Sequence, residues 1–250
     1  MVGGARVKLK VVGSSPAWPN PGGAQSGYLI EGPGRLLLDC GPGVLARLRE
    51  LDSANGWPHV DAIVVSHFHL DHWGDLVPWV WGLMVGPAKH QEPPELWVPP
   101  GGIEELATLG GRLGQPDMFA RTFRLREYTE GDPFRAAELE VLALRLPHYT
   151  LQTFGFRVTN GARSLAYSGD SGPSERLAEL ARDCDLFICE ATLERPELDG
   201  EPRGHLTADE AVAAFESSGA RRLLLTHRPH ELPLDGTLEL AYDGLELDLT

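Results

Sequence analysis

Cysteine is scarce in this sequence of 250 residues, which contains only Cys40, Cys184 and Cys189. Their number is odd, and each stands in an apolar, strand-like segment rather than in a pattern of paired cysteines. A small secreted domain held together by disulfides is therefore excluded. We expect the three thiols to be small buried hydrophobic groups rather than metal ligands, which fits a reducing compartment such as the cytoplasm.

Long apolar runs are also missing. The longest, such as Leu36–Leu38, Ile63–Val65 and Leu223–Leu225, are far shorter than the roughly 20 residues that cross a bilayer as a helix. Residues Met1–Val12 contain neither the long apolar core nor the small-residue cleavage site of a secretory signal. We therefore expect a cytoplasmic protein that does not span a membrane.

Basic residues are fewer than acidic ones. Lys and Arg total 22 against 36 Asp and Glu, which gives a formal net charge of −14. The Arg residues are scattered, and the longest basic run is the pair Arg221–Arg222. A large polyanion such as a folded RNA would be repelled unless a basic patch offset this charge. Nucleic acid is therefore disfavoured as a partner, and a small-molecule substrate is favoured.

The composition is otherwise that of an ordinary globular protein, with 42% hydrophobic and 23% charged residues. Short runs rich in Val, Leu and Ile alternate with Gly and Pro, and strands are followed by strands mixed with helices, twice over. This order favours an α/β protein, an αβ/βα sandwich of two mixed β-sheets flanked by helices. Because no long linker, short repeat or charge run interrupts residues 1–250, we expect a single domain.

The individual elements follow from the spacing of apolar residues. Strands are predicted at Val7–Val12, Tyr28–Glu31, Arg35–Leu38, Ala62–Ser66, Leu96–Val98, Thr122–Arg126, Leu139–Leu144, Phe154–Val158, Ser164–Ser168, Leu186–Glu190 and Arg222–Thr226. Helices are predicted at Val44–Leu51, Asp75–Val85, Ile103–Leu113, Ser174–Asp183 and Thr207–Ser217, the last with a capping box formed by Thr207 and Glu210. The turn signal Asp243-Gly244 predicts a hairpin that joins Thr237–Tyr242 to Leu245–Leu249.

The most informative segment is Ser66-His67-Phe68-His69-Leu70-Asp71-His72, which follows a predicted buried strand. His67 and His69 alternate with apolar residues, so both imidazoles point the same way if the backbone is extended. Asp71 and His72 come next, where the chain turns toward a helix. Two imidazoles at one centre, with a carboxylate and a third imidazole at the next, are donors that suit a borderline-soft divalent metal. The alternative is a structural or pH-sensitive His cluster.

This segment resembles the signature of the metallo-β-lactamase superfamily, and the resemblance continues over nearly the whole chain. Three further polar residues end apolar strands in the order that the superfamily requires: His148 in Leu146-Pro147-His148, Asp170 in Tyr167-Ser168-Gly169-Asp170-Ser171 and His227 in Leu223-Leu224-Leu225-Thr226-His227. The resemblance implies that His67, His69 and His148 hold one metal ion. It implies that Asp71, His72 and His227 hold the other, and that Asp170 bridges the two.

Further local sequences resemble the tRNase Z and phosphodiesterase branch of the superfamily. They are Phe154-Gly155-Phe156-Arg157, Glu190-Ala191-Thr192 and the segment that runs from His205 to Ala211. In that branch a Glu and a His outside the metal ligands act together, and Glu190 and His205 are the matching positions. Members that process tRNA generally carry a long arm between the third His and the bridging Asp. Here these two residues are only 22 positions apart, so the resemblance is to members without the arm.

The resemblance implies a hydrolase with two divalent ions, for which zinc is favoured and Mn²⁺ or Fe²⁺ are alternatives. Such a pair lowers the pKa of a bridging water, and the resulting hydroxide attacks phosphorus in line. Asp71 is expected in this catalytic centre, and His205, oriented by Glu190, is expected to protonate the departing alkoxide. The predicted activity is a phosphodiesterase for a small or cyclic-nucleotide phosphodiester. A homodimer is implied by the resemblance alone.

Other functions remain open on the sequence. The same metal site could hydrolyse carboxylic esters, thioesters or lactams, and a tRNA 3′-processing endonuclease is a further candidate. A non-catalytic metal-binding protein is disfavoured because every ligand position is filled.

Several other side chains have two interpretations. Asp39 either steadies a ligand His or is a turn residue at the end of a strand. Trp73, Trp79 and Trp81 either stack on a nucleobase or belong to the core, which is the commoner place for aromatic residues on a helix. The loop Ser14–Gly23 is a candidate wall of the cleft.

Overall fold

The computed structural model describes residues 6–52, 56–234 and 236–249. The strands of its first half are β1 (Val7–Gly13), β2 (Gly27–Glu31), β3 (Arg35–Leu38), β4 (Ala62–Val64), β5 (Glu95–Val98) and β6 (Arg124–Glu127). The strands of its second half are β7 (Phe134–Ala136), β8 (Leu139–His148), β9 (Leu151–Thr159), β10 (Ser164–Tyr167), β11 (Leu186–Glu190), β12 (Leu223–Thr226) and β13 (Glu246–Leu249). The helices are α1 (Val44–Leu51), α2 (Leu76–Met84), α3 (Gly102–Arg112), α4 (Met118–Thr122), α5 (Arg176–Leu180) and α6 (Ala208–Ser218), with short 3₁₀ turns η2 (Leu70–His72) and η3 (Pro196–Leu198).

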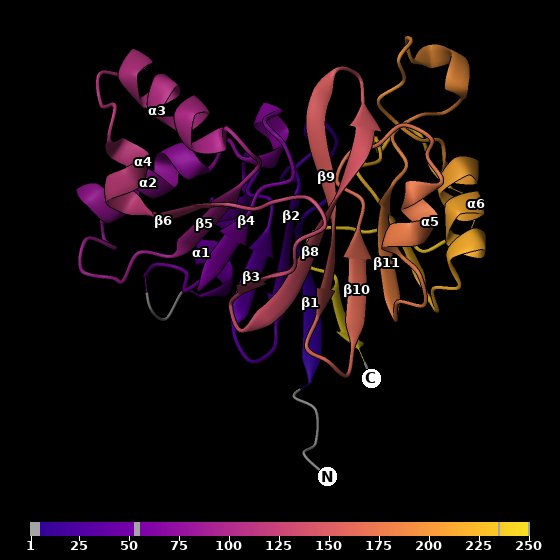
Figure 1. Ribbon diagram of the computed structural model, residues 1–250, viewed down its shortest axis with the longest axis horizontal. Coiled ribbons are helices and arrows are strands. Elements are labelled where there is room, and N and C mark those ends of the chain that lie inside the picture. Colours follow the sequence, from indigo (N-terminus) through magenta and orange to yellow (C-terminus); the bar gives the residue numbers. More distant parts are fainter. Residues whose placement is uncertain (1–5, 53–55, 235, 250) are drawn as a thin grey trace.

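Two β-sheets form the middle of the molecule. The first has the strand order β13-β1-β2-β3-β4-β5-β6, and the second has the order β12-β11-β10-β9-β8-β7. Helices α1 to α4 lie outside the first sheet, and α5 and α6 lie outside the second (Figure 1). The prediction of an αβ/βα sandwich is confirmed.

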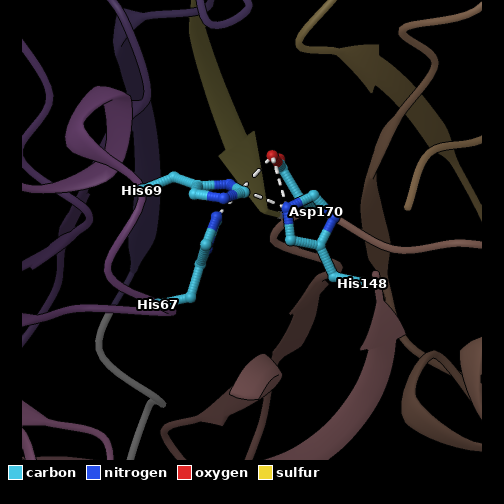
Figure 2. A group of neighbouring side chains, drawn as sticks. All are labelled: His67, His69, His148 and Asp170. Atoms are coloured by element: carbon cyan, nitrogen blue, oxygen red, sulfur yellow. Dashed lines mark hydrogen bonds and ion pairs between the residues drawn. The ribbon is translucent and has the colours of Figure 1, made fainter. Parts of the chain in front are cut away.

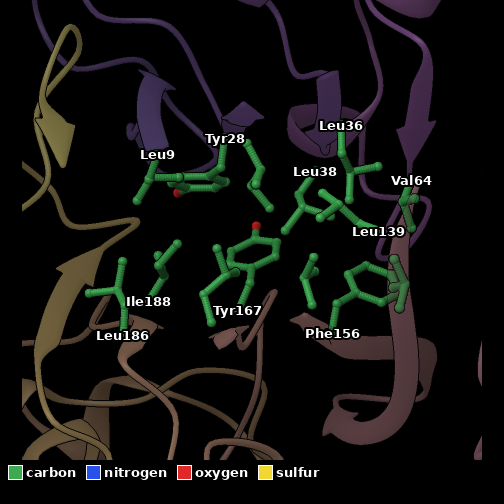
Figure 3. Packing of buried hydrophobic residues seen from close by; sticks show 14 of the residues in the cluster. Leu9, Tyr28, Leu36, Leu38, Val64, Leu139, Phe156, Tyr167, Leu186 and Ile188 are labelled. Atoms are coloured by element: carbon green, nitrogen blue, oxygen red, sulfur yellow. The ribbon is translucent and has the colours of Figure 1, made fainter. Parts of the chain in front are cut away.

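The space between the sheets is filled with apolar side chains (Figure 3). Labelled there are Leu9, Tyr28, Leu36, Leu38 and Val64 of the first sheet and Leu139, Phe156, Tyr167, Leu186 and Ile188 of the second. Strand β3 shows why both faces of the first sheet are buried: Leu36 and Leu38 point to this core, while Leu37 packs under the helices. A strand buried on both faces appears in the sequence as an unbroken apolar run.

The direction of the strands decides where polar residues gather. Strands β3 to β6 are mutually parallel, and so are β10 to β12. The carboxyl ends of parallel strands share one edge of a sheet, where open α/β sheets bind ligands. The segments that follow β3, β4, β10, β11 and β12 therefore meet at one edge of the sandwich.

The hairpin predicted at the C-terminal end is wrong. Of the predicted strand Leu245–Leu249, Glu246–Leu249 forms β13, but this strand pairs antiparallel with β1, and residues 237–242 form no strand. Leu240 makes only an isolated bridge to Leu225. The turn at Asp243-Gly244 is present, since Gly244 has a φ of 92°. However, the Asp243 carboxylate accepts backbone N–H groups of Ser14 and Ala24, so the turn serves a contact that is distant in sequence.

Smaller differences lie around the edge strands. Thr122, predicted as the first residue of a strand, ends helix α4, and the strand begins at Arg124. Strand β7 was not predicted, because it has only three residues at the edge of its sheet.

The capping box of Thr207 and Glu210 is confirmed at the start of α6. Among the described residues no helix has the length and apolarity to cross a bilayer.

Candidate metal centre

Tight turns at strand ends bring the predicted ligands to one edge of the sandwich. Four of them lie in the segment that follows β4 and contains the turn η2: His67, His69, Asp71 and His72. The other three stand at the ends of β8, β10 and β12: His148, Asp170 and His227. Gly169 has a φ of 58°, and a Cβ there would lie 2.9 Å from the Phe154 carbonyl oxygen. Only glycine fits this turn, which presents Asp170 to the site.

The first group comprises His67, His69, His148 and Asp170, whose ligand atoms all lie within 4.8 Å of one another (Figure 2). The Nε2 atoms of His67 and His148 each lie 3.8 Å from Asp170 Oδ2. His148 Nε2 is also 2.9 Å from His69 Nδ1. Three imidazole nitrogens and one carboxylate oxygen converge as the ligands of a zinc-type ion would.

The second group comprises Asp71, His72, Asp170 and His227. His72 Nε2 lies 3.2 Å from Asp170 Oδ1 and 3.3 Å from Asp71 Oδ2. His227 Nε2 lies 3.1 Å from Asp71 Oδ2 and 3.6 Å from Asp170 Oδ1. Asp170 therefore belongs to both groups and turns one carboxylate oxygen to each.

Unsatisfied buried atoms show that these residues fit metal ions. His67 Nε2, His72 Nε2 and Asp170 Oδ1 are buried and have no hydrogen-bond partner among the described residues. Proteins rarely bury polar atoms without partners. All three atoms point into the two groups, so a cation in each group would satisfy them. The donors, neutral imidazole and carboxylate, are those that bind Zn²⁺ and similar divalent ions.

The electrostatics of the first group agree with this interpretation; in the second group burial would lower the pKa of His72, but Asp170 and Asp39 outweigh it and raise that pKa well above its usual value. Burial and the neighbouring imidazoles hold the pKa of His67 well below its usual value, and burial also lowers the pKa of His148, so both are neutral, as a ligand must be. Burial alone would raise the pKa of Asp170, but the charges of His227 and His72 outweigh it and keep the carboxylate ionised. The first group therefore offers negative charge and neutral imidazole nitrogens together.

In three of the histidines predicted as ligands, the protein also contacts the second ring nitrogen. His72 Nδ1 lies 2.7 Å from Asp39 Oδ2, His148 Nδ1 lies 2.6 Å from the Gly204 carbonyl oxygen, and His227 Nδ1 lies 2.9 Å from Thr192 Oγ1. Such contacts fix the tautomer and the ring orientation of a metal-binding histidine.

Asp39 thus contacts His72, one of the predicted ligands, and is more than a turn residue. It is fully buried, and its carboxylate also accepts hydrogen bonds from the Ser66 hydroxyl and backbone N–H and from the Tyr167 hydroxyl. Its φ of 58° is unfavourable for a residue with a side chain. A strained backbone of this kind persists where surrounding contacts hold it, often at a functional site.

We predict that Asp39→Asn lowers metal affinity by about 10–100-fold, the range found for such partners of metal ligands. The amide keeps the shape of the side chain but removes the charge that orients His72. Competition with a chromogenic chelator measures the affinity. Tyr167→Phe is the matched control, because it removes one hydrogen bond to Asp39 and leaves the contact with His72; its loss should be smaller. Equal affinities for Asp39→Asn and the unaltered protein would contradict this role.

The predicted pair of Glu190 and His205 lies beside both groups. Glu190 Oε1 is 2.9 Å from His205 Nδ1, and the His205 ring centre is 5.0 Å from that of His148 and 5.8 Å from that of His227. Burial works against the charged form of His205, but Glu190 and Asp170 outweigh it and raise the pKa of His205 to about 9. Since Nδ1 is engaged by Glu190, Nε2 is the nitrogen that can reach a substrate.

Thr192 is a residue of the site that the sequence did not single out. Its hydroxyl donates to Glu190 Oε2 at 2.8 Å and lies 2.9 Å from His227 Nδ1, which can donate to it. Thr192 therefore connects the Glu190–His205 pair to a ligand of the second group. Glu190, His205 and His227 also lie close enough to form a third group of metal-binding type. The signal in the sequence was the place of Thr192 in Glu190-Ala191-Thr192, a segment that resembles the tRNase Z and phosphodiesterase branch.

Trp73, at the end of η2, and the α2 residues Trp79 and Trp81 do not border the cavity next to His205 and His227. Trp79 is 1% exposed and packs edge-on against Trp57, with ring centres 6.0 Å apart. Trp73 packs against Phe68. The cavity next to His205 and His227 is lined instead by Trp18, from the loop that was a candidate wall of the cleft.

Comparison with known proteins agrees with this geometry. Residues 34–228 match the beta-lactamase superfamily domain. The chain is 34% identical to the uncharacterized protein ML1173 of Mycobacterium leprae, over 89% of this chain and 78% of that protein. It is 29% identical to the probable metallo-hydrolase YhfI of Bacillus subtilis, over 90% of this chain and 88% of that protein.

Solved structures give the same answer for the fold. The crystal structure of YhfI, a metallo-beta-lactamase fold protein, aligns with a TM-score of 0.81 at 25% identity and covers 97% of this chain and 99% of that chain. The short form of human tRNase Z aligns with a TM-score of 0.76 at 22% identity, covering 97% of this chain and 99% of that chain. The similarity to the human enzyme concerns the fold alone.

Proposed function

Because the chain belongs to the beta-lactamase superfamily and is a metal-dependent hydrolase, we propose that it is a phosphodiesterase for small substrates, including cyclic nucleotides. The observation that carries this proposal is the Glu190–His205 pair beside the two metal-type groups. An alkoxide is a poor leaving group, so its departure from phosphorus needs a proton donor. A thioester releases a thiolate, which is a much weaker base than an alkoxide, so its cleavage has less need of a proton donor.

The proposal assigns two divalent ions to the site, with zinc favoured and Mn²⁺ or Fe²⁺ as alternatives. His67, His69 and His148 would hold one ion, Asp71, His72 and His227 would hold the other, and Asp170 would serve both. When bound, such ions lower the pKa of water and neutralise charge on phosphate oxygens. Asp71 contributes to catalysis through this second group.

The protein's own groups provide the proton. Glu190 accepts a hydrogen bond at His205 Nδ1, and this keeps the proton to be transferred on Nε2. The raised pKa of His205, about 9, means that the imidazole carries this proton near neutral pH. Ser171 N–H and the Thr192 hydroxyl both donate to the Glu190 carboxylate and hold it in place. The pair is therefore fixed before a substrate arrives.

The remaining parts of the proposal concern the whole chain. We treat residues 1–250 as one domain and place it in the cytoplasm, where Cys40, Cys184 and Cys189 would stay as the free buried thiols found here. That the protein forms a homodimer remains a prediction. The proposed substrate of the protein is a small molecule rather than nucleic acid.

Transfer RNA is disfavoured although relatives include enzymes named ribonuclease Z, such as that of Archaeoglobus fulgidus. All residues from His148 to Asp170 are described, and β9, β10 and short turns account for them, so no arm is inserted there. A net charge of −14 also opposes the approach of a polyanion.

We therefore predict that the metal-loaded protein does not trim the 3′ end of a precursor tRNA at a useful rate. A labelled precursor and gel analysis of the products measure this at several salt concentrations, with a ribonuclease Z as the positive control. Efficient trimming that weakens with salt, as normal nucleic-acid binding does, would contradict the assignment to small substrates.

A further inference from the structure

A cavity of about 480 Å³ opens beside the metal centre and reaches His205 and His227. Its other walls are loop residues Ala17 and Trp18, the ring of Tyr149, and two segments, 192–199 and 229–232. This volume lies in the range of about 300–1,000 Å³ that is usual for small-molecule sites. A larger hollow of about 660 Å³ lies over α5 and α6, but none of the metal-type groups borders it. The smaller cavity is the one that serves the chemistry.

One wall is an aromatic face that the protein holds in place. Trp18 is 52% exposed, yet its loop is anchored at both ends, because the Asp243 carboxylate accepts the backbone N–H of Ser14 at 3.1 Å and of Ala24 at 2.7 Å. The side-chain amide of Gln25 also donates to the carbonyl oxygens of Pro16 and Ala17, next to Trp18. A half-exposed indole on a loop that is fixed in this way is suited to stacking on a flat ring.

Apart from the imidazolium of His205, which Glu190 already engages, the charges in the lining are negative. Glu194, Asp199 and Glu231 border the cavity, and no Lys or Arg does so among the described residues. The nearby Arg228 is largely buried, and its guanidinium donates to the carbonyl oxygens of Ala191 and Leu232. A further phosphate in this cavity, beyond the one that reacts beside His205, would therefore meet carboxylates with no described lysine or arginine next to it to offset them.

We propose that this cavity takes the alcohol part of the substrate and selects an aromatic alcohol that carries no further phosphate, such as a nucleoside. The proposal rests on the proposed function: the oxygen that His205 protonates must lie against His205, so the group bonded to that oxygen extends into the adjoining space. Trp18 stacks on its ring, and the carboxylates exclude additional phosphate groups. This selection gives the preference for small substrates a physical cause at the site itself.

The test compares three substrates of the metal-loaded protein. They are the dinucleoside monophosphate ApA, the same molecule with a 5′-terminal phosphate (pApA), and the same molecule with a 3′-terminal phosphate (ApAp). Whichever nucleoside leaves, one of the two added phosphates lies on the leaving side. The substrate with its added phosphate on the leaving side should have a kcat/KM at least about 10-fold below that of ApA, because the carboxylates repel this phosphate.

Two variants assign the effect to this cavity. The double variant Glu194→Gln, Glu231→Gln should raise the kcat/KM of the disfavoured substrate relative to ApA, while Glu104→Gln, Glu216→Gln, which replaces exposed acidic residues outside the cavity, should leave that ratio unchanged. Trp18→Ala should lower kcat/KM for ApA about 10-fold, within the range measured for stacking on a base. The control is Trp81→Ala, since Trp81 is 41% exposed and does not border the cavity.

A further substrate, bis-p-nitrophenyl phosphate, separates a failure of the proposed phosphodiesterase function from a failure of the proposed selection by the cavity. Failure to cleave bis-p-nitrophenyl phosphate would overturn the proposed function itself. If that substrate is cleaved and ApA, pApA and ApAp react equally well, the phosphodiesterase stands and the selection by the cavity is wrong. Equal effects of the Trp18 and Trp81 variants would likewise contradict stacking on Trp18.

Discussion

Asp170→Ala should strip the protein of both metal ions and reduce hydrolysis by about 10³-fold or more, because the ions supply several kcal/mol of charge stabilisation. The unaltered protein, purified with divalent metal present, should carry close to two equivalents. One oxygen of Asp170 lies 3.8 Å from the ligand nitrogens of His67 and His148. The other lies 3.2 Å from that of His72 and 3.6 Å from that of His227. Among the described residues, Asp170 is the only one that belongs to both the first and the second group.

Elemental analysis and calorimetric titration of the purified variant measure this loss directly. Asp199→Asn is the matched control, because Asp199 is a carboxylate near the site that binds the backbone N–H groups of Gly204 and His205 instead of a ligand group. It should retain close to two equivalents. A single tightly bound ion, present in both the unaltered protein and Asp170→Ala, would show that the dinuclear assignment is wrong.

His205→Ala should lower kcat on a cyclic nucleotide by about 10²–10⁴-fold, the usual contribution of a general acid. The leaving group there is an alkoxide, which needs the proton that His205 carries. The loss should shrink on bis-p-nitrophenyl phosphate, because p-nitrophenolate leaves readily without a proton. Comparison of the two substrates therefore separates proton donation from other roles of the residue.

Glu190 supplies the matched variant for this prediction. Glu190→Gln keeps the shape of the carboxylate that lies 2.9 Å from His205 Nδ1, so its defect should be related but smaller. The double variant should be little worse than His205→Ala alone, because residues that act as a unit have non-additive effects. Equal losses on both substrates would place His205 in phosphate binding.

Metal content is the second measurement on these variants. It should be unchanged in His205→Ala, since His205 lies outside the two groups that share Asp170. Loss of metal would instead favour the third group, in which Glu190, His205 and His227 lie close together.

How far the sequence predicts this site depends on how local the signal is. His67, His69, Asp71 and His72 lie within six positions, so their convergence follows from the backbone that surrounds them. His148, Asp170 and His227 could be recognised as polar ends of apolar strands, but only the family resemblance placed them in one site. Their actual distances depend on how two sheets pack, which no local pattern contains.

The failed hairpin illustrates the same limit. Asp243-Gly244 predicted a partner close in sequence for Leu245–Leu249, but the free edge of β1 offered a better one 230 residues away or more. Similarly, helical position could not show that the aromatic wall of the cavity is Trp18 rather than Trp73, Trp79 or Trp81. The loop that carries Trp18 is held at both ends by Asp243, a contact between residues far apart in the sequence.

The most direct test of the proposed activity is a panel assay of the metal-loaded protein against four classes of substrate: bis-p-nitrophenyl phosphate, cyclic nucleotides, a thioester and a β-lactam. Chelation of the metal gives the background for each. We predict metal-dependent turnover of the first two, with at most weak activity on the others. Rapid opening of the thioester or the β-lactam, with both phosphodiesters left intact, would contradict the account.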